Sequence, residues 1–157
     1  MAFEPSTRTT EKIGGPQVKQ FSIFLQNKVG ALLNIVKLLN EHAVDVLAVN
    51  VQDSADAAIV RVVVSDPDQV QDLFAMNDIA FSVCELVVVE LKESATDLSK
   101  LLTALLMAEV NIHGIYALLT RPRGVCAVAL HVEDNDCAGA VLRSHGFRIL
   151  DQSDISR

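Results

Sequence analysis

Val44-Asp45-Val46 and Val110-Asn111-Ile112 decide the fold, because they stand at the same point of one pattern that the chain uses twice. Each stretch ends an apolar helical segment and opens a strand-like one, and the second follows the first by 66 residues. A period this long, repeated only twice, indicates two small domains in tandem rather than a solenoid, which needs three or more units.

The apolar positions around these stretches repeat as well. Upstream, the first copy has Leu32, Ile35, Val36 and Leu39, and the second copy has Leu98, Leu101, Leu102 and Leu105 at the same offset of 66. Downstream, Val64 and Asp66 are matched by Val132 and Asp134 at an offset of 68. The second copy therefore has about two extra residues in one turn, and the hairpin turn at residues 121–124 is where they fit.

The composition predicts a folded protein. Half of the 157 residues are hydrophobic, which is ample for packed cores and argues against disorder. A single copy of about 65 residues would be marginally stable, because small domains bury a smaller share of their surface. We therefore expect the two copies to share a sheet or an interface, or the chain to form a dimer.

Charge and cysteine usage exclude several classes of partner. A net charge of −7 disfavours nucleic acid and anionic membrane, since both bind basic surfaces. No apolar run approaches a membrane span, and the N-terminus lacks the apolar core of a secretory signal. The three cysteines, Cys84, Cys126 and Cys137, are odd in number and lack C-x-x-C spacing. We expect a cytoplasmic protein without disulfides.

Apolar periodicity predicts the same elements in each copy. In the first copy these are a strand Val18–Leu25, a helix Ala31–Ala43, a hairpin of Val44–Gln52 and Ala57–Val64, a helix begun by Asp66-Pro67 and ended at Asn77, and a strand Ile79–Val83. In the second copy they are Leu86–Leu91, a helix Ala95–Ala108, a hairpin of Val110–Leu119 and Val125–Val132, a helix Asn135–Ser144 and a strand Phe147–Leu150.

Each copy therefore has the order βαββαβ of the ferredoxin-like arrangement. The predicted fold class is α+β, with two tandem ferredoxin-like units built on antiparallel sheets. We divide the chain into a flexible N-terminal arm over residues 1–17, one unit over 18–84, a second over 85–151 and a tail over 152–157. Only Cys84-Glu85 separates the last strand of the first unit from the first strand of the second, so the two sheets must lie close together.

Catalytic and metal sites are poorly supported by the sequence. The four histidines form no H-x-x-x-H pair or Cys/His cluster, and no G-x-S-x-G, P-loop or G-x-G-x-x-G is present. No nucleophile, base and orienting group can be assembled. We predict no catalytic residues, no metal and no cofactor, and read the histidines and cysteines mainly as core or surface residues.

The first strand-to-helix loop, Asn27-Lys28-Val29-Gly30-Ala31, is the best candidate for a ligand site. Asn27 can cap free amides, and Gly30 lets a ligand approach a helix start whose partial positive charge suits a carboxylate. The alternative reading is an ordinary turn. In the second copy Thr96 replaces Gly30, and Ser94 to Asp97 matches a capping box that would satisfy its own amides. We expect any carboxylate to use the first loop.

The element order, the N-x-x-G loop before Leu32 and the segment Val110–Tyr116 (VNIHGIY) resemble ACT domains, and the two joined copies resemble the stand-alone tandem ACT proteins of bacteria. The resemblance covers about residues 18–151. The family's usual loop is D-x-P-G, and this chain has Asn27 and Val29 where that loop has Asp and Pro.

The resemblance implies amino-acid binding at an interface between two ACT units. By position, the loop and helix start would supply Asn27, Lys28, Val29, Gly30, Ala31 and Leu32, and the facing strand would supply Asn111, Ile112 and His113. The carboxylate would meet the amides of Gly30–Leu32, and Asn27 and Asn111 would accept from the ammonium. Asn111 and His113 can also be read as a turn residue and a strand surface residue, and Lys28 as a solvated side chain.

The sequence therefore predicts a non-catalytic, allosteric regulatory protein that binds a small amino acid and forms a homodimer through exposed edges. Val29, Ala31 and Ile112 favour a small or branched apolar ligand. The regulated partner would be a separate metabolic enzyme. One alternative is an interaction subunit that docks on such an enzyme without a ligand, and another is a small ferredoxin-like enzyme.

Overall fold

A computed structural model describes residues 15–26 and 29–156 of the chain. The predicted arm lies outside the described residues as far as residue 14, as do Asn27 and Lys28. The elements, in chain order, are β1 (Val18–Gln26), α1 (Val29–Glu41), β2 (Val46–Asp53), β3 (Ala57–Val64), α2 (Pro67–Met76), β4 (Phe81–Leu91), α3 (Ala95–Met107), β5 (Ile112–Ala117), the short 3₁₀ turn η1 (Pro122–Gly124), β6 (Cys126–Val132), α4 (Asn135–Ser144), β7 (Ile149–Leu150) and α5 (Gln152–Ile155).

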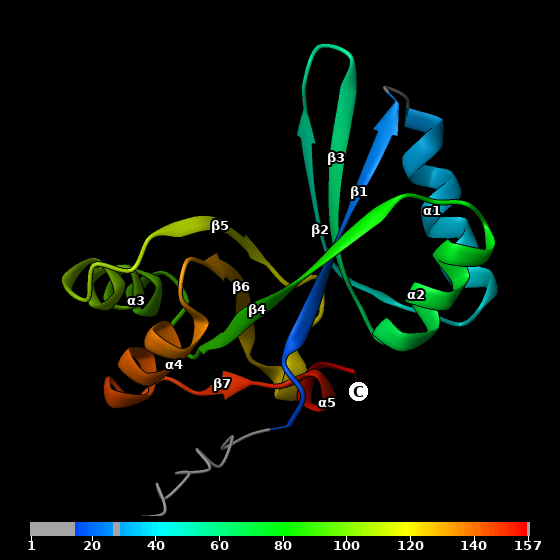
Figure 1. Cartoon of the computed structure of the whole chain (residues 1–157). Coiled ribbons are helices and arrows are strands. Elements are labelled where there is room, and N and C mark those ends of the chain that lie inside the picture. The colour runs from blue at the N-terminus through cyan, green and yellow to red at the C-terminus, as the bar shows by residue number, and fades with distance from the viewer. Residues whose placement is uncertain (1–14, 27–28, 157) are drawn as a thin grey trace, which may run out of the picture.

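Two ferredoxin-like units make up the molecule, as the repeat predicts (Figure 1). Unit 1 has the antiparallel strand order β2-β3-β1-β4, with α1 and α2 on one face. Unit 2 has the order β7-β4-β6-β5, with α3 and α4 on its own outer face. β-branched residues make up most of β3, and β4 contains the run Val87–Val89, where they fit a pleated surface that is covered by helices.

The strand β4 belongs to both units. Our prediction of separate strands at Ile79–Val83 and Leu86–Leu91 is wrong, because Phe81–Leu91 runs without a break. Its first half pairs with β1, with Cys84 opposite Gln20, and its second half pairs with β6 and β7. The in-and-out alternation of side chains passes unbroken through residues 84 and 85, so a single strand serves two sheets.

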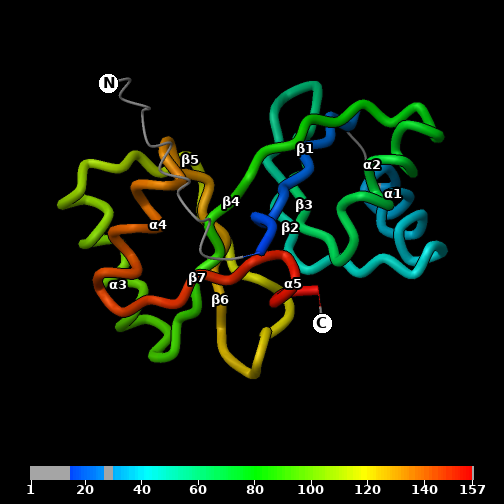
Figure 2. The backbone as a smooth tube through the Cα atoms, turned by 60° about the horizontal axis from the view of Figure 1, so that its bottom comes forward, coloured from blue at the N-terminus to red at the C-terminus, as the bar shows by residue number. Residues whose placement is uncertain are grey.

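Three apolar cores stabilise this arrangement. Two of them lie between each unit's sheet and its own pair of helices. The third lies between the helix-free faces of the two sheets and includes Leu47, Val63, Val88 and Ala129. Figure 2 shows the two helix pairs on opposite sides of the strands that meet at the centre. The third core therefore joins the units into one body.

Polar contacts close the same junction. The backbone N–H of Leu119, just after β5, donates to the carbonyl of Leu47 in β2 at 2.7 Å. The helix α5, in the predicted tail, places Gln152 against unit 1, where its Nε2 donates to the carbonyl of Val64 at 3.0 Å. Ser156 Oγ donates to the carbonyl of Ser65 at 2.8 Å. The end of unit 2 is thus tied to unit 1.

No helix within the described residues is long and apolar enough to cross a membrane.

Candidate functional site

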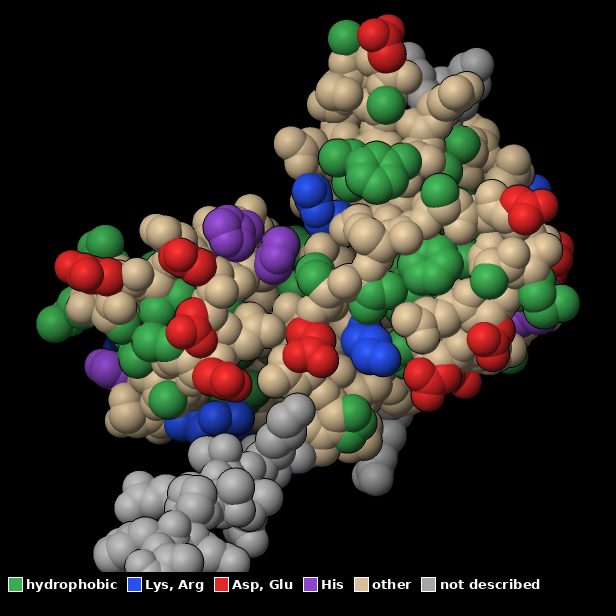
Figure 3. Space-filling view, in the orientation of Figure 1, with side chains coloured by type: hydrophobic (Ala, Val, Ile, Leu, Met, Phe, Trp, Pro, Cys, Tyr) green, Lys and Arg blue, Asp and Glu red, His purple; other side chains and the backbone are tan. Residues whose placement is uncertain are grey.

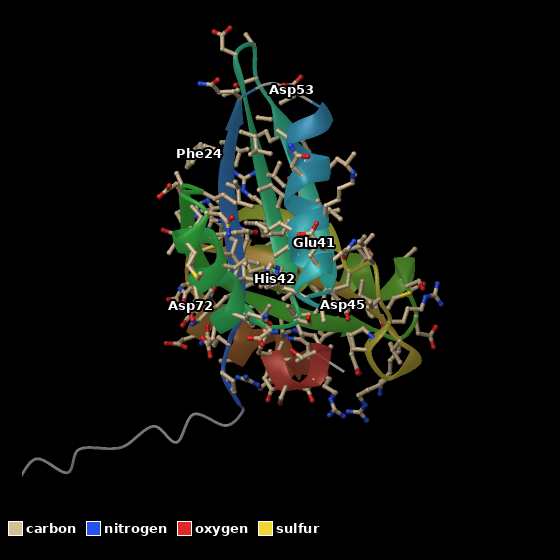
Figure 4. The ribbon with its side chains drawn as sticks, turned by 90° about the vertical axis from the view of Figure 1, so that its right-hand side faces the viewer. Phe24, Glu41, His42, Asp45, Asp53 and Asp72 are labelled. Atoms are coloured by element: carbon tan, nitrogen blue, oxygen red, sulfur yellow. The ribbon has the colours of Figure 1, made fainter. Side chains whose placement is uncertain are left out.

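The start of α1 forms the first half of the predicted site. Val29 opens the helix, Gly30 is exposed, and a Cβ added to Gly30 would meet nothing within 4 Å. Ala31 and Leu32 are half-buried, and Leu32 packs against the first core. The first turn of α1 carries no acidic residue, and Figure 4 shows Glu41 at the opposite end of the helix. The helix therefore contributes no carboxylate of its own to this end.

The start of α3 differs in charge. Asp97 lies in its first turn, and its Oδ2 accepts a hydrogen bond from the backbone N–H of Glu93 at 2.9 Å. The predicted capping box is wrong, because the Ser94 side chain makes no capping bond and Asp97 accepts from the N–H of Glu93 instead of that of Ser94. Ser94 has φ 44°, a left-handed conformation, so its hydroxyl is turned away from the amides it would cap. The helix start still holds its own carboxylate.

The start of β5 forms the second half. Asn111 is exposed, and its Nδ2 donates to Oε2 of Glu133 at 2.8 Å. The backbone repeats the link, since the N–H of Glu133 donates to the carbonyl of Asn111 at 3.0 Å. Ile112 is half-buried against the second core. The start of β5 thus carries two neighbouring hydrogen-bond acceptors, Oδ1 of Asn111 and the carboxylate of Glu133.

Glu133 was missed by the sequence reasoning, although the repeat carried a signal for it. The offset of 68 matches Glu133 with Ser65, and the offset of 66 matches Asn111 with Asp45. Ser65 Oγ accepts from the backbone N–H of Asp45 at 2.9 Å in unit 1. Asn111 and Glu133 thus repeat in unit 2 the contact between Asp45 and Ser65 in unit 1.

His113 lies in a different environment from its two neighbours. It is the extra residue of a β-bulge between Ile112 and Gly114, and its ring centroid lies 5.2 Å from that of His131. Bulges re-aim the side chain they carry. A contact between His113 and an amino-acid ligand stays a prediction.

One chain does not bring the two halves together. The start of α1 belongs to unit 1 and the start of β5 to unit 2, and the two elements lie in different lobes in both Figure 1 and Figure 2. A site built from both halves therefore needs a second chain.

An acidic hollow of about 640 Å³ adjoins this second half, where the end of α3 meets the start of α4. Its lining includes Glu85, Glu109, Glu133 and Asp136. Asn135 crosses it and donates from Nδ2 to the carbonyl of Glu85 at 3.1 Å. Across residues 15–26 and 29–156, no group of three or more His, Cys, Asp or Glu side chains could hold a metal ion.

Two ferredoxin-like units that share the strand β4 and differ at their first helix starts define a tandem α+β module. The chain belongs to the ACT domain pair family, whose model matches residues 17–156. No curated protein matches the chain.

Solved structures share the fold. Protein BT0572 from Bacteroides thetaiotaomicron is similar over 90% of this chain and 96% of its own, at 28% identity and a TM-score of 0.81. The ligand-free regulatory subunit of aspartate kinase from Thermus thermophilus matches 83% of this chain and 91% of its own, at 16% identity and a TM-score of 0.56. The regulatory subunit from Thermus flavus has the same coverage and identity, with a TM-score of 0.54. Membership of this family supports a regulatory, ligand-binding role.

Proposed function

We propose that this protein is a non-catalytic cytoplasmic regulator that binds a small amino acid at an interface between ACT units of two chains. The observation that carries the proposal is the contrast between the two helix starts. The start of α1 is open at Gly30 and has no acidic residue, whereas the start of α3 holds the Asp97 carboxylate. Free amides and the positive end of the helix dipole favour an anionic group at α1 alone.

A homodimer would complete two equal sites. A twofold axis that sets the start of α1 in one chain against the start of β5 in its partner generates the same contact twice. The edge strands β2 and β5 end the sheet path and are the natural places for this contact. The regulated enzyme would be a separate chain.

The chemistry of the two halves fits the two charges of an amino acid. The carboxylate would accept from the amides of Gly30–Leu32, with Asn27, outside the described residues, as the predicted cap. The ammonium would donate to Oδ1 of Asn111 and to the Glu133 carboxylate, which already accepts from Nδ2 of Asn111. Ala31 and Ile112 would contact the side chain, so we propose a small or branched apolar amino acid.

A thermal-shift screen of the twenty amino acids tests the proposal. A ligand at a hundred times its Kd adds about 2.7 kcal/mol of stability, which raises the Tm visibly. Gly30→Asp should abolish this rise through charge repulsion. The added side chain has open space, and an acidic residue in a first helical turn stabilises the helix, so the variant should fold.

Thr96→Asp is the matched control, because Thr96 stands 66 residues after Gly30 and is exposed in the first turn of α3. This variant should keep the full ligand response. An equal loss in both variants would mean that the ligand does not use the start of α1.

The alternative function, an interaction subunit without a ligand, has one observation in its favour. Leu106 and Met107 on α3 are 76% and 79% exposed, and the repeat places Asn40 and Glu41 at the same positions of α1. Exposed apolar residues on one helix are typical of a docking face. This function predicts no stabilisation by any amino acid, so a flat screen would favour it.

A further inference from the structure

A notch lies between the helix-free faces of the two sheets, above the third core. Figure 3 shows the hollow between the two lobes, with histidine side chains along one side and a basic side chain on the other. The third core closes its base, where Leu119 bonds to Leu47. The notch is formed within a single chain, and its residue His113 lies in β5, the strand that the interface proposed above also uses.

Arg61 of β3 forms the wall on the side of unit 1. It pairs across the strands with Ser22 on one side and Asn50 on the other. Its guanidinium donates to Oε1 of Gln52 at 3.0 Å, which fixes the side chain without neutralising its charge. Arg61 makes no ion pair with any described residue. Four of its five N–H donors remain for another group.

His113 and His131 form the opposite wall. The bulge at His113 sets its ring beside that of His131. The acidic group nearest to them along the chain is Glu133, whose carboxylate accepts from Asn111. Neither histidine forms an ion pair with a described residue, although His131 also borders the acidic hollow that is lined by Glu85, Glu133 and Asp134.

The floor is a hydrogen-bonded chain of three residues. Tyr116 donates to Oε1 of Gln20 at 2.6 Å, and Gln20 Nε2 donates to Sγ of Cys84 at 3.3 Å. Gln20 is 1% exposed, so this chain satisfies a buried amide and holds the two walls at a fixed separation. Because the floor groups already bond to one another, a ligand would bind Arg61 and the two histidines of the walls.

The charge of Arg61 influences the pKa values of His131, Cys84 and Tyr116. Burial lowers the pKa of His131, and the charges of His113 and Arg61 lower it further. Burial raises the pKa of Cys84, and Arg61 opposes the shift. Burial also raises the pKa of Tyr116, with Arg61 again opposing. Arg61 lies two residues from Val63 of the third core, so it shares the helix-free face of β3 that borders the notch.

We propose that the notch binds a small oxyanion, a carboxylate or a phosphate, between Arg61 and the His113–His131 pair. Charge-assisted hydrogen bonds from a guanidinium and imidazolium rings are the strong contacts that such groups receive in proteins. The net charge of the chain is −7, so a group of basic side chains without ion pairs is opposite in sign to the protein as a whole. The anion would bridge unit 1 and unit 2 and restrain their relative movement.

The binding should strengthen as the pH falls. His131 recruits the anion only when protonated, and its pKa lies below its ordinary value. Cys84 and Tyr116 stay neutral on lowering the pH, and Arg61 stays charged. The carboxylates of the hollow that His131 also borders, Glu85, Glu109, Glu133, Asp134 and Asp136, compete with the anion for the protonated ring. Binding should therefore be weak at about pH 8 and tighter at about pH 5.5, below the ordinary histidine pKa, and should strengthen further at lower pH because the pKa of His131 is lowered.

Isothermal titration calorimetry with inorganic phosphate and with acetate tests the proposal. We expect saturable binding of at least one anion at about pH 5.5, with roughly a tenfold or larger loss of affinity in Arg61→Gln, the cost of one charge-assisted bond. Arg148→Gln is the control. Arg148 is exposed and lies just before β7, at the other edge of β4 from β6, so this variant should bind as the parent does.

The two anions distinguish the source of the ligand. Binding of phosphate alone assigns the notch to a phosphorylated compound, and binding of acetate alone assigns it to a carboxylate. His131→Gln, which should also weaken binding at low pH, replaces Arg61→Gln if that variant fails to fold. The absence of saturable binding of either anion, or binding by Arg61→Gln equal to that of the parent, would overturn the proposal. Neither variant touches Gly30, so the amino-acid response tests the other site separately.

Discussion

Unit 1 and unit 2 end their first helices with the same turn. The backbone N–H of Val44 donates to the carbonyl of Leu39 at 2.9 Å, and that of Val110 donates to Leu105 at 3.0 Å. The residue before each donor is not glycine, yet has φ of 56° in unit 1 and 57° in unit 2. A left-handed residue at a helix end costs free energy unless it is glycine. Both units accept that cost because the next residue must enter its core.

The cores themselves are filled differently. Unit 1 packs Phe21, Phe74 and Phe81 together, with ring centroids 5.7 to 5.9 Å apart. The repeat places Val87, Leu142 and Ile149 at the matching positions of unit 2. The comparison teaches that the shared turns fix the backbone, while each core reaches close packing with side chains of its own.

Truncating matched core residues should have the largest effect. Phe74 and Leu142 are both 0% exposed, and replacement by alanine should cost about 3–5 kcal/mol for Phe74→Ala and about 2–5 kcal/mol for Leu142→Ala. Because β4 and the third core belong to both units, either variant should still unfold in one transition. Urea titrations followed by far-UV circular dichroism and by the fluorescence of Tyr116, the chain's single tyrosine, measure this.

Two separated transitions would contradict this expectation. If Phe74→Ala moved the circular dichroism midpoint and left the Tyr116 signal unchanged, unit 1 would unfold without disturbing the junction. Val51→Ala is the control, since Val51 is 49% exposed and its truncation leaves the core intact.

Disrupting the hydrogen bonds at the floor of the notch should cause the next largest loss of stability. Tyr116→Phe removes the donor to Gln20 Oε1 and leaves a buried acceptor unpaired, at a cost of about 1–3 kcal/mol. The repeat places Leu86 at the position of Gln20 in unit 2, so an apolar residue suits this face of the strand. Adding Gln20→Leu to Tyr116→Phe should therefore recover stability, measured by urea titration of all four chains in a double-mutant cycle. Simple additivity of the two losses would show that the bond contributes nothing.

The sequence predicted the elements and their order well, because each is coded locally. The bounds of β3 and α4 agree with the prediction, since β-branched runs and a capping aspartate mark them. The helix α1 begins two residues earlier than predicted, and β7 begins two residues later. These errors fall at ends, where the hydrogen bonding of one residue decides the assignment.

The junction could not be predicted in the same way. Alternation shows that residues 82 to 88 have two faces, but nothing local shows that one strand pairs with β1 and then with β6. Arg61 and His131 lie 70 residues apart, and only the meeting of two sheet faces relates them. The loop Asn27–Ala31 was a candidate from its residues alone, whereas Asn111, Ile112 and His113 depended on the family resemblance, and the two halves lie in different units.

Removing the helix caps should have the smallest effect on the free energy of unfolding, and it compares the helix starts of the two units. Asp66 Oδ1 accepts from the N–H of Gln69 at 3.1 Å, and Asp134 Oδ1 accepts from Cys137 at 3.0 Å, so the caps of α2 and α4 match. Asp66→Ala and Asp134→Ala should each cost about 1 kcal/mol. Ser94→Ala should cost far less, because Ser94 makes no capping bond.

Urea midpoints at constant slope measure the three losses. Ser94→Gly extends the test, because Ser94 has φ 44° and glycine adopts positive φ readily. That variant should be as stable as the parent or more stable. A loss for Ser94→Ala as large as that for Asp66→Ala would mean that the hydroxyl does cap α3. The start of α3 would then have two groups that satisfy its amides, Ser94 and Asp97, and the charge of Asp97 would no longer be needed to support the proposed use of α1 by a carboxylate.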